Sequence, residues 1–155
     1  MTQKPDFDLQ SAHKYFSASS FNSAWDLIEN SERSDEQDRE MLRLSFASLY
    51  HWTQREDVKD TNLSVAYWQI SRIYALLNQA ENARRYAELS LDKLDDALAE
   101  PFLTAYAYEA LARAAMVAGR TDLIYTYKAQ AENLLEKIVS TQEREMIAAD
   151  LETIH

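Results

Sequence analysis

Residues 66–87 read AYWQISRIYALLNQAENARRYA and contain two helix-forming patterns with a short break between them. Tyr67, Ile70 and Tyr74 recur at spacings of three and four residues, which places their side chains on one face of a helix. The apolar pattern stops at Asn78 and then resumes. The stretch therefore predicts an antiparallel helical hairpin. Its two helices are expected at about residues 61–78 and 80–98.

The composition of the whole chain favours helices throughout. The 155 residues include one Gly, two Pro and no Cys. So few glycines and prolines leave little turn chemistry for sheets, whereas Ala, Leu, Glu and Arg are good helix formers. The lack of cysteine excludes disulfides and Cys-ligated metal sites. We expect one all-α domain over residues 1–155.

Similar patterns predict about eight helices in total. Leu42, Phe46 and Tyr50 share the predicted buried face of a helix at about 36–54. The remaining expected elements are a hairpin at about 7–31, made of helices 7–18 and 21–31, a hairpin at 101–139 and a capping helix at 141–153.

Several residues mark the expected helix ends. Ser34 and Gln37 have the spacing of a capping box, in which each side chain satisfies a free amide of the first turn. Asp60 is an expected N-cap, and Pro101 suits a first helical turn. Gly119, the only glycine, lies where a helix has to stop, because glycine adopts left-handed backbone angles without strain.

The hairpin pattern repeats after forty-one residues. The matched pairs are Tyr67 and Tyr108, Ile70 and Leu111, Ser71 and Ala112, Arg72 and Arg113, Asn78 and Gly119, and Tyr86 and Tyr127. Small residues such as Ser71, Ala83 and Ala112 let two helices approach closely where they cross. A hairpin buries only part of its apolar surface alone, so stacking against a neighbour completes the core.

The pattern resembles the tetratricopeptide repeat (TPR), W-x2-L-G-x2-Y followed by Ala and an aromatic residue. Tyr67 stands at the Trp position, Ile70 at Leu, Ser71 at Gly and Tyr74 at Tyr. The resemblance implies a right-handed stack of antiparallel helical hairpins. The forty-one-residue spacing, against thirty-four in the family, and the unpaired helix at 36–54 depart from it. A generic helical bundle is the alternative.

The resemblance also implies a concave groove that binds a peptide or helix of a partner protein. The ninth position of each first helix, which faces that groove in the family, holds His13, Arg72 and Arg113. The other expected groove residues are Leu9, Trp68 and Glu109 at the fifth position, Tyr106 at the second, and His51 beside them. Arg and Trp are common in binding hot spots. In the alternative interpretation, Trp68 packs against the helix expected at about 36–54, and the arginines pair with Glu109 or other neighbours.

The sequence shows no catalytic constellation. His13, His51 and His155 lie far apart, no pair has the i, i+4 spacing of a helical zinc site, and one glycine cannot form a phosphate loop. We therefore expect no catalytic residue, cofactor or metal, and a non-enzymatic protein. The alternative is a small-molecule-binding or metal-binding helical protein, with weak catalysis, that uses His13, His51 and nearby Tyr or Glu.

The charge of the chain bears on its partners. Sixteen basic and twenty-six acidic side chains give a net charge of −10, which disfavours nucleic acid. No apolar run approaches the ~20 residues of a membrane span, and MTQKPDFDLQ lacks the apolar core of a signal peptide. We expect a cytoplasmic protein that binds a protein or peptide, or a second copy of itself, and no membrane.

Overall fold

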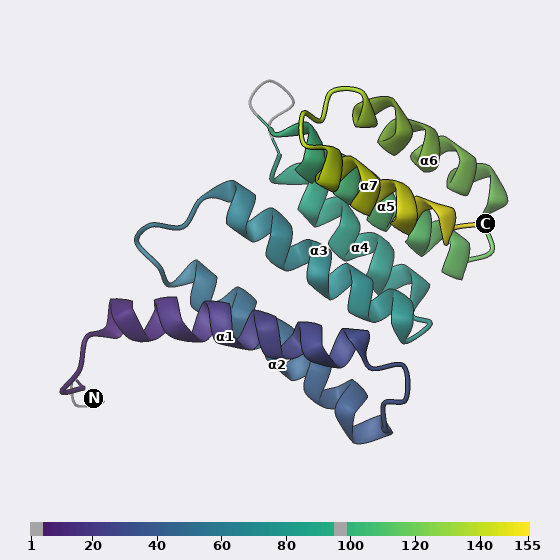
Figure 1. The fold of residues 1–155 in the computed structure, drawn as a ribbon. Coiled ribbons are helices and arrows are strands. Elements are labelled where there is room, and N and C mark those ends of the chain that lie inside the picture. Colours follow the sequence, from purple (N-terminus) through teal and green to yellow (C-terminus); the bar gives the residue numbers. More distant parts are fainter. Residues whose placement is uncertain (1–4, 95–98) are drawn as a thin grey trace. The chain divides into compact units, whose positions relative to one another are not determined.

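The structure is a computed structural model that describes residues 5–94 and 99–155. Over these residues the chain forms seven α-helices and no strand, which confirms the all-α prediction (Figure 1). Neighbouring helices pack against one another. The helices are α1 (Leu9–Glu29), α2 (Asp35–Thr53), α3 (Asp60–Leu76), α4 (Ala80–Asp92), α5 (Pro101–Val117), α6 (Thr121–Leu135) and α7 (Thr141–Glu152).

The chain divides into two compact units, Met1–Leu63 and Ser64–His155, and each is described by itself. In the first unit, α1 and α2 pack side by side and run antiparallel (Figure 1). The boundary falls within α3. The rest of α3 and helices α4 to α7 belong to the second unit.

The predicted hairpin at 7–31 is wrong, because α1 is one continuous helix of 21 residues. The serines near the expected break are buried in the helix instead of forming a turn. The Ser17 hydroxyl donates to the Lys14 carbonyl at 3.0 Å, within the helix itself. The Ser48 hydroxyl of α2 donates to the Ser17 carbonyl at 2.7 Å. Small serines therefore allow the two helices to approach closely, and their hydroxyl groups find partners without ending α1.

The predicted capping box of α2 is confirmed. The Ser34 side chain accepts from the Gln37 amide, and the Gln37 side chain accepts from the Ser34 amide. The N-cap prediction for Asp60 is off by one residue, because α3 begins at Asp60 itself. There the Asn62 side chain accepts from the Lys59 amide at 2.9 Å. These local contacts satisfy amides that a helix start leaves free.

Serine hydroxyls also join α3 to α4 in the second unit. Ser64 and Ser90 donate to each other's backbone carbonyls at 2.8 and 2.9 Å. The Ser71 hydroxyl donates to the Ala83 carbonyl at 2.8 Å, and both residues are buried. The expectation that Ser71 and Ala83 lie where two helices meet is therefore confirmed. The predicted helix at 80–98 ends at Asp92, and residues 95–98 lie outside the described part of the chain.

The turns after α3 and α5 have the same backbone structure. Asn78 has φ of 56° and Gly119 has φ of 68°, both in the left-handed region. The Gln79 amide donates to the Tyr74 carbonyl at 2.9 Å, and forty-one residues later the Arg120 amide donates to the Ala115 carbonyl at 2.9 Å. A bond of this span closes a Schellman motif at a helix C-terminus. Gly119 therefore ends α5 as predicted.

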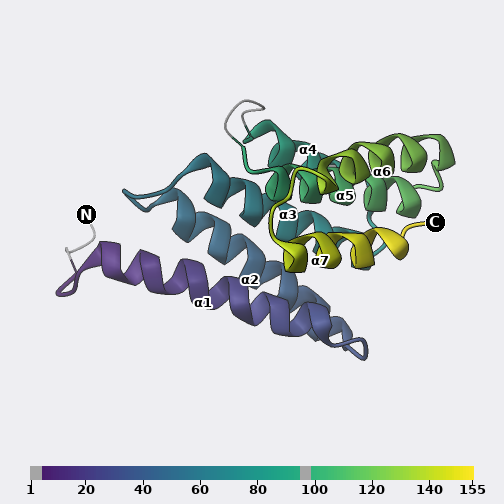
Figure 2. The same cartoon turned by 45° about the horizontal axis from the view of Figure 1, so that its top comes forward.

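Helix α5 is at the centre of the second unit. Helices α4, α6 and α7 pack around it (Figures 1 and 2). Alanines on α5 meet larger apolar side chains of α6 and α7. The buried members of this core are Ala105, Ala112, Ala115, Ile124, Ala131, Ile138, Ile147, Leu151 and Ile154. Small side chains on the central helix let its three neighbours approach it closely.

Candidate functional site

Two of the predicted site residues meet in the first unit. His13 on α1 and His51 near the end of α2 are 38 residues apart in sequence, yet their Nδ1 atoms are 2.8 Å apart. The ring centroids are separated by 5.1 Å with a tilt of 46°. At this distance one neutral ring donates its Nδ1–H and the other accepts. The antiparallel packing of α1 and α2 creates this pair.

The two histidines belong to a group of five rings, which we call the ring cluster: His13, Tyr15, Phe16, Tyr50 and His51. Phe16 lies 5.3 Å from His51 and 5.2 Å from Tyr15. Tyr50 lies 5.4 Å from His51 and 6.5 Å from His13. These separations are typical of interacting aromatic pairs. The cluster is therefore continuous across α1 and α2.

Much of the ring cluster is exposed to solvent. Tyr15, Phe16 and Tyr50 are 66%, 47% and 57% exposed, whereas the two histidines are half-buried. The prediction that Tyr50 faces the core is therefore wrong. Burial lowers the pKa of His51 from its ordinary value, and the nearby His13 lowers it further. A lowered pKa favours the neutral imidazole.

In the second unit, a fully buried carboxylate joins two predicted arginines. Oε1 of Glu109 accepts from Nε of Arg113 at 2.7 Å and from Nη1 of Arg72 at 3.2 Å. The Glu109 side chain is 0% exposed, and the Arg113 side chain is 11% exposed. Burial raises the pKa of Glu109, and the two arginines oppose that shift. The pairing of both arginines with Glu109 agrees with the alternative interpretation of the sequence.

The same ion-pair group continues into α7. Nη2 of Arg113 donates to the Asp150 carbonyl at 3.1 Å and to the Thr153 hydroxyl at 2.8 Å. The Tyr106 hydroxyl donates to the Asp150 carboxylate at 3.1 Å. Burial raises the pKa of Tyr106, and the Asp150 charge raises it further. These polar contacts hold α7 against α5, in addition to the apolar packing between the two helices.

Trp68 lies beside this group and takes part in packing. Its ring lies 5.2 Å from that of Tyr106 in an edge-on arrangement. It also packs against a buried group that contains Ala87, Ala110 and Leu111. Trp68 is half-buried. Its contacts therefore stabilise the junction of α3, α4 and α5.

The eight residues predicted as a single partner site thus fall into two groups. Leu9, His13 and His51 lie in the first unit. The second unit holds Trp68, Arg72, Tyr106, Glu109 and Arg113, which lie together. Sequence reasoning missed the exposure of the other three rings in the cluster. Helical spacing identified an apolar face on α1, but spacing alone does not show which part of that face another helix covers.

Among the described residues, no group of three or more His, Asp or Glu side chains converges on a point that could hold a metal ion. A hollow of about 320 Å³ opens between α5 and α6, and its lining includes Thr104, Tyr108, Asn133 and Lys137. Among the described residues of that lining, Lys137 is the only charged one.

Within the described parts of the chain, no helix combines the length and the apolar character needed to cross a lipid bilayer. Comparisons with protein-family models, with curated proteins and with solved structures give no match to this chain.

Proposed function

We propose that this protein is a non-enzymatic interaction module that binds a peptide or a helix of a partner protein. The observation that carries the proposal is the exposed ring cluster on α1 and α2. Three large aromatic side chains that are 47% to 66% exposed lie in one continuous group. Exposed apolar groups of this kind mark interaction sites, and aromatic residues dominate binding hot spots.

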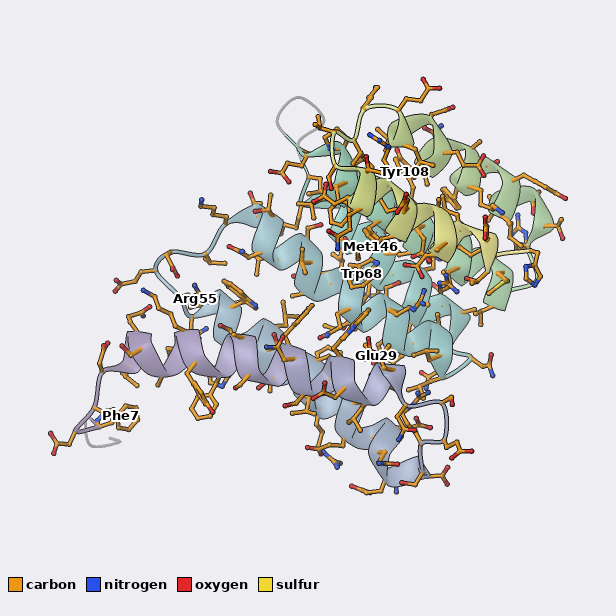
Figure 3. All side chains as sticks on the ribbon, in the orientation of Figure 1. Phe7, Glu29, Arg55, Trp68, Tyr108 and Met146 are labelled. Atoms are coloured by element: carbon orange, nitrogen blue, oxygen red, sulfur yellow. The ribbon has the colours of Figure 1, made fainter. Side chains whose placement is uncertain are left out.

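The acidic excess of the chain favours a basic partner. Asp6 and Asp8 flank Phe7, which is 63% exposed and lies just before α1 (Figure 3). The whole chain carries a net charge of −10. An amphipathic helix with apolar side chains on one face and Lys or Arg on the other complements both features. A second copy of this acidic chain would instead add like charges.

The arginine group of the second unit is a less favourable docking surface. The Glu109 carboxylate is completely buried and binds both arginines. A partner would have to break these bonds to reach it, and an unpaired buried charge is costly. In our proposal, Trp68, Arg72, Tyr106, Glu109 and Arg113 hold α3, α5 and α7 together, and the partner contacts the ring cluster.

The proposal includes a TPR-like arrangement of the second unit and a cytoplasmic location. Two features support the repeat: the hairpins α3–α4 and α5–α6, and the identical turns at Asn78 and Gly119. A module that presents one surface to a partner fits the use of such helical scaffolds.

The test uses a labelled synthetic peptide of about 18 residues with Leu on one helical face and Lys on the other. Binding to the full chain is measured by fluorescence anisotropy at physiological salt. We expect Phe16→Ser and Tyr50→Ser each to weaken binding about thirtyfold or more, since truncating a hot-spot residue removes about 2 kcal/mol or more. Tyr125→Ser is the matched control, because Tyr125 on α6 is 72% exposed and lies in the other unit.

Two further measurements identify what binds to the ring cluster. The first is binding of a scrambled peptide of equal composition. If it binds as tightly as the amphipathic peptide, charge attraction alone explains the binding, and the proposal is overturned. Light scattering of the protein without peptide tests the second-copy alternative. If the protein forms a dimer and Phe16→Ser makes it monomeric, the ring cluster is a self-association surface instead.

A further inference from the structure

The Nδ1 atoms of His13 and His51 lie close enough together for one metal ion to bind both rings. They are 2.8 Å apart and come from two different helices. At metal–nitrogen distances of about 2.0–2.1 Å, two ligands about 90° apart have nitrogens about 2.9 Å apart. Two ligands in a tetrahedral site have nitrogens about 3.4 Å apart. The observed 2.8 Å is the length of the present hydrogen bond, and only a small movement of the two rings would bring it to the 90° value of Cu²⁺ and Ni²⁺ sites.

The protonation of the pair is compatible with metal binding. A metal ligand has to be a neutral imidazole with a free lone pair. One Nδ1 of the pair carries no proton, and its lone pair becomes free for a metal once the hydrogen bond that it accepts is broken. In the other ring, the proton moves from Nδ1 to Nε2 through water, so no net proton is released. Both rings are half-buried, which leaves them room to turn toward a common point.

We propose that His13 and His51 form a two-histidine site for a divalent transition metal of the Cu²⁺ or Ni²⁺ kind. Imidazole is a preferred ligand for both ions, and Cu²⁺ binds most tightly in the first-row series. No third His, Asp or Glu converges here among the described residues. Water therefore completes the coordination, and the site stays open to solvent. The bound metal connects α1 directly to α2.

This inference is independent of partner binding, and its test requires no peptide. Copper(II) chloride is added to the full chain without an affinity tag. Electron paramagnetic resonance then measures how many nitrogens couple to the copper. We expect one bound Cu²⁺ with two imidazole nitrogens, and ¹⁵N-labelled histidine changes the splitting pattern. We also expect the melting temperature to rise with copper concentration, because a ligand that binds only the folded state stabilises it.

Three variants locate the copper. We expect His13→Gln and His51→Gln each to abolish the two-nitrogen signal and the rise in melting temperature. His155→Gln, which changes the third histidine at the chain end, is expected to keep both. Circular dichroism checks that each variant retains its helices.

Several outcomes would overturn the inference. One is a wild-type spectrum with one histidine nitrogen or none, a result that does not depend on the folding of any variant. Another is copper binding that is unchanged in His13→Gln and His51→Gln. Binding that only His155→Gln removes would place the copper at the chain end.

Discussion

Burial determines how much an ion pair contributes to the stability of this protein. Two ion pairs with the same helical spacing differ in their burial. Glu109 and Arg113 lie four residues apart on α5 and are almost completely buried. Arg84 and Glu88 lie four residues apart on α4, where about 45% of each side chain is exposed. Water screens the α4 pair. The buried α5 pair instead replaces its lost hydration with hydrogen bonds within the pair, to Arg72 and to groups near the end of α7.

We expect Glu109→Ala to lower the free energy of unfolding by about 3–5 kcal/mol, because Arg113 would remain buried without its carboxylate partner. Glu88→Ala, the matched control, is expected to change it by less than about 1 kcal/mol. Urea denaturation followed by circular dichroism measures both. Equal losses in the two variants would show that the burial of Glu109 is not what makes this ion pair important.

At the scale of helices, side-chain size and helix ends determine how neighbours meet. Serine hydroxyls bond to carbonyls of the adjacent helix at α1–α2 and at α3–α4, so closely packed backbones keep their polar groups satisfied. The turns after α3 and α5 share one left-handed residue and one hydrogen-bond pattern. The first turn uses Asn78 and the second uses Gly119, although glycine adopts this backbone with less strain.

The two turns are therefore expected to respond oppositely to substitution. Gly119→Ala should lower the free energy of unfolding by about 1 kcal/mol, because an L-residue is strained at a φ of 68°. The added methyl group itself would meet no atom within 4 Å. Asn78→Gly should be neutral or stabilising at the equivalent position. Thermal and urea unfolding measure both changes, and a marked loss in Asn78→Gly would indicate that its side chain, and not its φ angle, matters.

At the scale of the whole molecule, the excess of acidic side chains sets the electrostatic field that a partner meets. The net charge is −10. Such a field attracts basic partners and repels further copies of the chain, and dissolved salt screens it. The exposed rings, in contrast, contribute through apolar contact that salt does not screen.

We therefore expect the affinity for the basic amphipathic peptide to fall as sodium chloride rises from about 0.1 M to 1 M, where the screening length shortens from about 10 Å to about 3 Å. A peptide with Gln in place of Lys should bind more weakly but with little dependence on salt. Anisotropy titrations at both concentrations test this. An affinity for the basic peptide that does not change with salt would contradict a role for the acidic surface.

Much of the local structure could be predicted because it depends on neighbouring residues. Ser34 and Gln37 satisfy the first amides of α2, and Gly119 ends α5, as their positions in the sequence indicate. The break expected within 7–31 was wrong for a tertiary reason. Ser17 looks like a helix-ending residue in isolation, but in the structure it faces α2 and bonds within its own helix.

The sequence by itself determined the helical class, the main helix ends, the repeated turn and the acidic charge. Each of these follows from short-range backbone chemistry or from composition. Only the tertiary structure decided that His13 meets His51, that Glu109 is buried between two arginines, and that Tyr50 is exposed. These features depend on which helix faces cover one another, and helical periodicity gives an apolar face without identifying its neighbour.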